Sequence, residues 1–256
     1  MTSSARVSVD DGVAEIVVSN QGAKNAIDAN MARELIVACD RVDADPTIGV
    51  AIIRGADGFF CSGGARDELA SASVSPVSDA SIAALQGIYD AFLRVGRLKV
   101  ATIAAIRGGA VGAGANLALA ADVRVVADDV RFMSGFVNLG VHPGGGHYAL
   151  LNRTAGSQIA TALGVLGETV DGPRAVELGL AYASVPDDEV EDRARSLARL
   201  AGRDPALTRA SVAILRTEAG PPAVSWDSAV AMERGVQAWS LQRKGVDGWA
   251  TQKRVR

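Results

Sequence analysis

The chain has 256 residues, of which 26 are Lys or Arg and 29 are Asp or Glu, so its formal net charge is −3 at pH 7. A near-neutral chain that is 48% hydrophobic can build a core, which excludes an intrinsically disordered protein. The small acidic surplus excludes binding of nucleic acid through a generic basic surface. Only 4% of the residues are aromatic and 28 are Gly, so we expect small core side chains and many tight turns.

Two cysteines, Cys39 and Cys61, are too few for a disulfide framework, which favours a cytoplasmic protein. Residues 1–10 lack the basic start and apolar run of a signal peptide. The uncharged stretch at residues 108–121 is shorter than the roughly 20 apolar residues that span a bilayer. We therefore expect a soluble protein without membrane contact. No Cys and His spacing is typical of a metal site, so no metal is expected.

The first part of the chain alternates predicted strands, glycine-rich loops and helices. The Asp-Gly pair at residues 11–12 predicts a hairpin, and Asp28 is a suitable N-cap for a helix that runs to about Asp43. Residues 71–81, rich in Ser, Ala and Asp, are expected to form a mobile surface connection. The other predicted elements are strands at residues 7–9, 13–19, 50–54, 100–106 and 123–127, and helices at residues 82–95 and from about 115 to 121.

The last part of the chain is predicted to be mainly helical. A glycine cluster at residues 140–146 precedes a helix, and a strand signal remains only near residues 182–185. Asp187 and Asp204 have the positions of helix starts. The order of elements predicts an α/β core followed by a helical C-terminal region.

Two glycine-rich loops, at residues 59–65 and 106–116, each follow an apolar strand and lead toward a helix. Such a loop leaves unpaired backbone N–H groups at a helix N-terminus, where they can hold an anion or a developing oxyanion. One such loop is most simply a tight turn, but two at matching places favour a ligand site. A dinucleotide site is the alternative, since Gly112 and Gly114 follow a strand and Asp128 or Asp129 lies downstream. Against it, Leu117 occupies the position of the third Gly of that fingerprint.

Five segments in chain order carry a resemblance to a known family. They are Lys24-Asn25-Ala26-Ile27, Phe60-Cys61-Ser62-Gly63-Gly64, residues 105–114 followed by Ala121-Asp122-Val123-Arg124, residues 140–146 with His142 and Pro143, and Gly248 with Lys253 and Arg254. With this set the chain resembles the crotonase, or enoyl-CoA hydratase/isomerase, superfamily over nearly its whole length. None of the five segments is specific when taken singly.

The resemblance implies a crotonase-like ββα spiral core with a helical C-terminal trimerisation region. It places the acyl-CoA-binding core at residues 1–200 and the oligomerisation region at residues 201–256, and it implies a homotrimer or a dimer of trimers. The substrate would be an acyl-CoA thioester. Coenzyme A would then be part of the substrate, with no separately bound cofactor.

By position, the resemblance makes the backbone N–H groups of Gly64 and Ala113 the oxyanion hole that holds the thioester oxygen. The two carboxylates that hydratases of this family use would stand at Asn116 and Phe136. An amide cannot take up a proton at neutral pH and a phenyl ring cannot act as an acid or a base, so we expect hydration to be weak or absent.

Other residues could supply acid–base chemistry or bind the substrate. His142 and His147 flank the third glycine cluster and are the only His residues of the chain, and each could also serve only local hydrogen bonding. Ser134 and Tyr148 are possible polar pocket residues. The resemblance places four further residues at the coenzyme A moiety, with the positive charges suited to its phosphates: Lys24, Ala26, Ser62 and Lys253.

The leading hypothesis is thus an acyl-CoA-processing enzyme that resembles enoyl-CoA hydratase/isomerase and works through a backbone oxyanion hole. Two alternatives stay open. The chain could bind acyl-CoA without turning it over, or it could be a divergent hydrolase or isomerase of this fold that uses His142 or His147.

Overall fold

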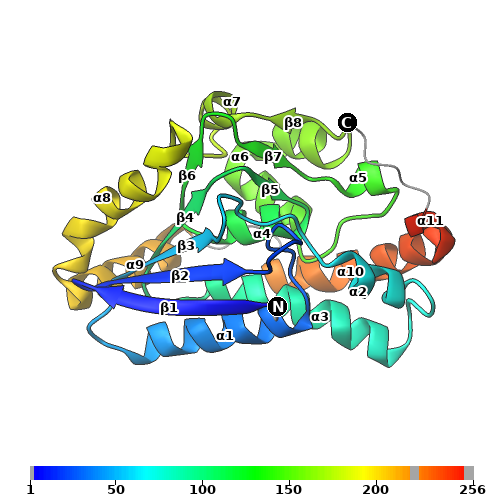
Figure 1. Cartoon of the computed structure of the whole chain (residues 1–256), viewed down its shortest axis with the longest axis horizontal. Helices are drawn as coiled ribbons and strands as arrows, with labels where there is room; N and C mark the ends of the chain where they lie inside the picture. The colour runs from blue at the N-terminus through cyan, green and yellow to red at the C-terminus, as the bar shows by residue number, and fades with distance from the viewer. Residues whose placement is uncertain (1–2, 220–224, 251–256) are drawn as a thin grey trace.

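The computed structural model describes residues 3–219 and 225–250. Its main sheet has six strands in the order β1-β2-β3-β4-β6-β9, and every neighbouring pair is parallel except the β1–β2 hairpin at one edge (Figure 1). The strands of this sheet are β1 (Ser4–Asp10), β2 (Val13–Ser19), β3 (Val50–Gly55), β4 (Ala101–Ile106), β6 (Val123–Ala127) and β9 (Ala183–Val185).

The predicted hairpin and its turn are confirmed. Asp11 and Gly12 both have positive φ angles, 43° and 75°, which match the backbone twist that a two-residue hairpin needs. Asp10 pairs with Val13, so the turn fixes the register of the whole hairpin. Ala14, Ile16 and Val18 on alternate positions of β2 are then buried on one face of the sheet.

Helices cover both faces of the sheet. The helices α1 (Ala29–Ala44) and α3 (Asp79–Gly96) pack on each other, and α1 also packs on the hairpin, whereas α8 (Val190–Gly202) packs on β3, β4 and β6 (Figure 1). Asp28 caps α1 as predicted, because its Oδ1 accepts a hydrogen bond from the N–H of Met31 at 2.8 Å. Layers on both sides explain why β3 and β4 are apolar along almost their whole length.

A second, three-stranded sheet lies beside the first, with the order β5-β7-β8. It consists of β5 (Gly109–Val111), β7 (Arg131–Met133) and β8 (Thr169–Val170). The strand β5 lies inside the predicted glycine loop at residues 106–116, and the sequence predicts no element at β7 or β8. The prediction of a mobile connection at residues 71–81 is also wrong in part. A helix, α2 (Arg66–Ala72), enters this segment, and Ser78 caps α3, which begins three residues earlier than predicted.

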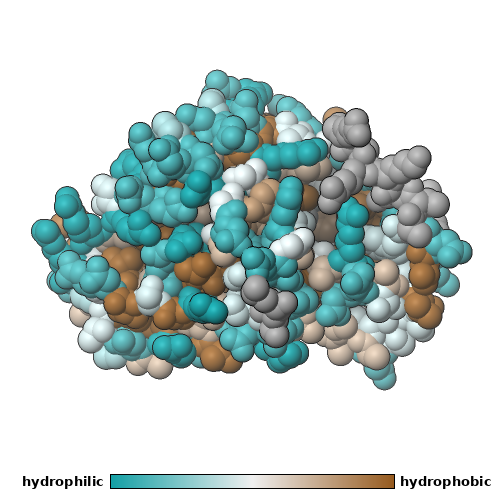
Figure 2. Space-filling model, in the orientation of Figure 1, coloured by the Kyte–Doolittle hydropathy of each residue, from teal (hydrophilic) through white to brown (hydrophobic). Residues whose placement is uncertain are grey.

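The remaining helices complete the molecule. They are α4 (Ala113–Ala120), α5 (Phe136–Leu139), α6 (His147–Gly164), α7 (Gly172–Glu177), the short 3₁₀ helix η1 (Asp187–Glu189), α9 (Pro205–Ala219), α10 (Trp226–Lys244) and α11 (Asp247–Ala250). In Figure 1, α10 and α11 lie at the end of the molecule that also holds α2 and α5. Within the described residues, no helix is both long and apolar enough to cross a membrane. Hydrophilic residues cover most of the face in Figure 2, and hydrophobic ones gather there in small groups.

Candidate active site

The first glycine loop follows β3 and is held in place by the loop that precedes α1. The N–H of Ile27 donates to the carbonyl of Gly63 at 2.7 Å, and the N–H of Ala65 donates to the carbonyl of Ile27 at 2.8 Å. These two hydrogen bonds are made by the carbonyl of Gly63 and the N–H of Ala65, on either side of Gly64. The N–H of Gly64 therefore points away from Ile27. Gly63 has a φ of 105°, a conformation that a residue with a Cβ rarely adopts. The N–H of Gly64 has no backbone acceptor among the described residues.

The second glycine loop brings the start of α4 next to the first. Gly112, with a φ of 57°, precedes Ala113, which is the first residue of α4, so the N–H of Ala113 has no acceptor within the helix. A Cβ on Gly63 would lie 3.5 Å from the nitrogen of Ala113. The two loops are also tied by hydrogen bonds from the N–H of Cys61 to Gly109 and from the N–H of Val111 to Cys61. Two unused donors therefore lie side by side.

A narrow pocket of about 70 Å³ opens at these donors. Its walls are mostly apolar, and the described residues that line it include no Asp, Glu, Lys or Arg. The lining comprises both glycine loops (Ser62, Gly63, Gly64, Val111, Gly112, Ala113), the side chains Leu69, Leu85, Ile88, Tyr89, Asn116, Ser134, Phe136, Leu139, Val141, Gln237 and Leu241, and the backbone of Gly135 and Gly144. Such a pocket suits an apolar acyl chain whose polar end meets backbone N–H groups.

Three buried polar side chains meet at the pocket wall. The Oγ of Ser134 lies 2.6 Å from the Nε2 of His147, and the Nδ1 of His147 lies 2.6 Å from the Oδ1 of Asn116. The Nδ2 of Asn116 donates to the carbonyl of Gly144 at 3.1 Å. All three side chains are at most 2% exposed, and Ser134 and Asn116 line the pocket.

The hydrogen bond to Gly144 fixes the direction of every other bond in this group. Since the amide nitrogen of Asn116 faces a carbonyl, its oxygen faces His147, and Nδ1 of that ring must carry the proton. Complete burial lowers the pKa of His147 to about 3, with a smaller contribution from His142, so the ring is neutral at pH 7. Its Nε2 therefore has a free electron pair, and the hydroxyl of Ser134 donates to it.

The two other predicted catalytic positions lie around this group in different ways. The ring of Phe136 is half-buried, lines the pocket and packs edge-on against His147 with 5.0 Å between ring centroids. His142 is not among the residues that line the pocket; its Nδ1 lies 2.7 Å from the carbonyl of Pro143, and its ring packs on Tyr148. His147 does not line the pocket either, but it contacts three residues that do, Ser134, Asn116 and Phe136, whereas the contacts of His142 described above are with Pro143 and Tyr148.

Three of the four residues predicted to contact coenzyme A are described, and they lie at the first glycine loop and the segment bonded to it. Lys24 is exposed, with a φ of 50°, and its Nζ lies 5.1 Å from the ring centroid of Phe59. Ser62 bonds to this segment twice, through its N–H to Lys24 and through its Oγ to Ala23 at 2.8 Å. Ala26 is buried beneath the same loop. Lys253 lies outside the described residues.

A comparison with protein-family models matches residues 8–240 to the enoyl-CoA hydratase/isomerase model. This match covers both glycine loops, every lining residue of the pocket except Leu241, and most of α10. The chain belongs to the enoyl-CoA hydratase/isomerase family. It is therefore an enzyme of that family, and its fold is the crotonase fold predicted from the sequence motifs.

Relatives of this family member include hydratases and an isomerase. A probable enoyl-CoA hydratase of Mycobacterium tuberculosis is 37% identical over 239 residues, which cover 92% of this chain and 91% of the relative. The 1,2-epoxyphenylacetyl-CoA isomerase of Escherichia coli is 30% identical over 191 residues, or 75% of this chain and 73% of the isomerase. The crystal structure of an enoyl-CoA hydratase from Mycobacterium avium subsp. paratuberculosis superposes with a TM-score of 0.81 at 24% identity, covering 97% of this chain and 98% of that one.

The sequence does not predict the part that α10 plays in the site of this family member. Gln237 and Leu241 of α10 line the pocket, and Glu233 accepts hydrogen bonds from the N–H groups of Gly146, His147 and Tyr148 at the start of α6. Burial raises the pKa of Glu233 to about 7, against the opposing effect of those three donors. No local pattern marks Glu233, since its partners lie 85 to 87 residues earlier in the chain.

Tyr89 on α3 is a further pocket residue. The sequence pattern predicts only that it lies on the apolar face of its helix. The side chain is 4% exposed and lines the pocket, and its hydroxyl has no hydrogen-bond partner among the described residues. Burial raises the pKa of this hydroxyl, which therefore stays a neutral donor. A free buried donor favours ligands that present an acceptor to it.

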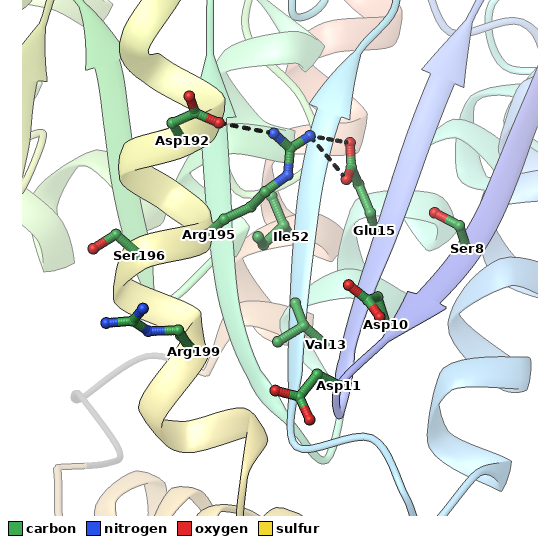
Figure 3. A pocket seen from close by; sticks show the side chains of 10 residues that line it. All are labelled: Ser8, Asp10, Asp11, Val13, Glu15, Ile52, Asp192, Arg195, Ser196 and Arg199. Atoms are coloured by element: carbon green, nitrogen blue, oxygen red, sulfur yellow. Dashed lines mark hydrogen bonds and ion pairs between the residues drawn. The ribbon is translucent and has the colours of Figure 1, made fainter.

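A second and larger hollow, of about 470 Å³, lies between the β1–β2 hairpin and α8. Figure 3 shows Arg195 in the middle of it, paired with Glu15 at 3.2 Å and with Asp192 at 3.1 Å. None of the residues that line it belongs to a glycine loop, so it is separate from the pocket. The described part of the chain also contains no cluster of three or more His, Cys, Asp or Glu that could hold a metal ion.

Proposed function

We propose that this protein acts on acyl-CoA thioesters, with the thioester oxygen held by the backbone N–H groups of Gly64 and Ala113. The observation that carries the proposal is the pair of unused N–H donors at the end of an apolar pocket. Fixed donors that meet an oxygen as it gains negative charge stabilise the transition state by about 3–4 kcal/mol each. Lys24, exposed beside the first glycine loop, supplies a positive charge for the phosphates of coenzyme A.

We further propose that the protein does not hydrate enoyl-CoA at a useful rate. Addition of water needs one group to take a proton from the water and another to protonate the α-carbon. The positions of the two usual carboxylates hold Asn116, which is locked between His147 and Gly144, and Phe136, which packs on His147. The lack of carboxylates among the described lining residues supports the same conclusion.

Residues 201–256 are proposed as an oligomerisation region that follows an acyl-CoA-binding core at residues 1–200. Its described helices expose several large apolar side chains: Leu207, Ile214 and Leu215 on α9, and Trp239 on α10. A homotrimer or a dimer of trimers would cover them, and light scattering coupled to size exclusion measures which of the two forms.

Binding and hydration are tested separately. Calorimetric titration with butanoyl-CoA and crotonyl-CoA is expected to show binding, and infrared spectra of the ¹³C-carbonyl-labelled thioesters are expected to show a lower stretching frequency in the complex, because donors polarise the bond. Loss of the enoyl absorbance of crotonyl-CoA is expected to stay near the uncatalysed rate. Binding without a carbonyl shift contradicts the oxyanion hole, and hydration at the rate of an ordinary hydratase contradicts the second proposal.

A further inference from the structure

The group Ser134, His147 and Asn116 has the order of donors and acceptors found in enzymes with an activated nucleophile. A hydroxyl donates to one ring nitrogen of a neutral imidazole, and the other ring nitrogen donates to a fixed oxygen. This arrangement recurs on unrelated folds, with an aspartate or an asparagine as the third member. It is therefore recognised by geometry and not by its place in the sequence.

Ser134 also lies next to the oxyanion donors. Strands β5 and β7 run in parallel, with Val111 opposite Met133, and the N–H of Gly112 donates to the carbonyl of Met133 at 3.2 Å. The residues that follow, Ala113 and Ser134, therefore leave the same edge of the small sheet, and both line the pocket. A carbonyl oxygen bound at Ala113 brings its carbon to the side of the pocket where Ser134 stands.

We propose that Ser134 is a nucleophile that His147 activates, and that the pocket hydrolyses acyl-CoA thioesters through an acyl-serine ester. This inference rests on the proposed function, because it needs the thioester in the oxyanion hole. It is an activity different from hydration, and it uses the neutral imidazole of His147, which contacts Ser134 behind the pocket wall.

The first half-reaction transfers the acyl group to the protein. The Oγ of Ser134 forms a bond to the thioester carbon while its proton moves to the Nε2 of His147. The carbonyl electron pair moves to the oxygen, which the N–H groups of Gly64 and Ala113 stabilise. When the electron pair returns, the C–S bond breaks, and the sulfur leaves with the proton from His147 as free coenzyme A.

The second half-reaction regenerates the serine. Water gives a proton to the Nε2 of His147 and attacks the ester carbon, and the Oγ of Ser134 leaves with that proton. The products are a carboxylic acid and coenzyme A, and the only co-reactant is water. The apolar walls of the pocket favour an uncharged acyl chain.

The test uses the full chain with acetyl-CoA, butanoyl-CoA and crotonyl-CoA. Samples quenched in acid are expected to gain the mass of one acyl group, and peptide mapping is expected to place it on Ser134. Release of coenzyme A, followed with a thiol reagent, is expected to fall on the order of 1,000-fold or more in Ser134→Ala and His147→Gln. Ser73→Ala is the matched control, because Ser73 is a buried serine that does not line the pocket, and its hydroxyl bonds to the backbone carbonyl of Leu69 and to the indole of Trp249.

Labelling provides a measurement that does not depend on how the variants fold. A fluorophosphonate reagent is expected to modify Ser134 in the unmodified sequence and to leave Ser73 unlabelled. A chain that binds butanoyl-CoA but is neither acylated nor labelled at Ser134 overturns the inference, as does release of coenzyme A by folded Ser134→Ala at the original rate. Failure of the calorimetric titration instead overturns the proposed function, so the two failures are distinguishable.

Discussion

Replacement of Ala113 by proline removes the N–H group that we propose as one of the two oxyanion donors, with little other change to the backbone. Ala113 is the first residue of α4, a position where proline fits because its missing N–H has no acceptor in the helix. The residue before it is Gly112, which has no Cβ and a ψ of −119°, so it does not clash with the proline ring. Ala113→Gly is the matched control, since it changes the side chain and keeps the N–H group.

The expected loss follows from the value of one donor in an oxyanion hole, which is about 3–4 kcal/mol of transition-state stabilisation, or roughly 100- to 1,000-fold in kcat. The proline ring also places a carbon where the donor hydrogen pointed, which adds to the loss. Ala113→Gly is expected to lower the free energy of unfolding by at most about 1 kcal/mol and to keep most of the activity. Ala113→Pro is expected to unfold within about 1 kcal/mol of the original protein.

Two measurements decide the outcome. The carbonyl stretching frequency of bound ¹³C-labelled butanoyl-CoA is expected to shift less in Ala113→Pro than in Ala113→Gly, and release of coenzyme A is expected to be slower in the proline variant. Urea denaturation shows whether both variants are folded. Equal carbonyl shifts and equal rates in the two folded variants would refute the assignment of Ala113 to the oxyanion hole.

Two further predictions concern Glu233 and Asn116 at the pocket, and a third concerns Arg209 at the end of α1. The pKa of Glu233 rises from 4.5 to about 7 on folding, so protonation of Glu233 stabilises the folded state. This contribution to the free energy of unfolding is on the order of 3 kcal/mol. It is complete below about pH 4.5 and is lost as the pH rises through about 7. Glu233→Gln should therefore remove part of the decline in unfolding free energy between pH 5 and 8. Asn116→Asp places a carboxylate against the carbonyl of Gly144. It should lower the free energy of unfolding, measured by urea denaturation, by about 2 kcal/mol at pH 8 and by much less at pH 5. Arg209 donates to four backbone carbonyls in the last turn of α1 and just after it, and Arg209→Met should lower the free energy of unfolding by about 2–3 kcal/mol.

Each of these predictions has an outcome that contradicts it. A Glu233→Gln variant whose stability follows the same pH dependence as the original would mean that Glu233 does not titrate between pH 5 and 8. Asn116→Asp with equal stability at pH 5 and pH 8 would mean that the carboxylate finds another donor. Arg209→Lys, which keeps the charge but not the fork of donors, serves as the control for Arg209→Met and should lose most of the same stability.

The parts of the fold that the sequence predicts correctly depend on local chemistry. The hairpin follows from Asp11 and Gly12, and the start of α1 follows from Asp28, because a turn or a cap is decided by a few adjacent residues. The glycine loops are found for the same reason. Strands β5, β7 and β8 are missed because two or three residues are too short for a periodic pattern, and their pairing joins distant segments.

The candidate site also has a part that local motifs predict and a part that only the packing of distant segments decides. Gly64 and Ala113 can be located from loop motifs, and His147 can be named as one of two candidates. Its bonds to Ser134 and Asn116 span 13 and 31 residues and depend on how β7, α4 and α6 meet. The contact that separates His147 from His142 is therefore a property of packing, which no single stretch of sequence contains.

The position of α10 links the pocket to the last helices of the chain. Because Gln237 and Leu241 belong to α10, the wall of the pocket is complete only while that helix is docked on α6 through Glu233. Any ligand that touches this wall binds the docked chain more tightly than a chain with α10 released. By mass action, such a ligand adds RT ln(1 + [L]/Kd) to the free energy of releasing the helix, so the substrate itself protects the C-terminal part of the protein from proteolysis.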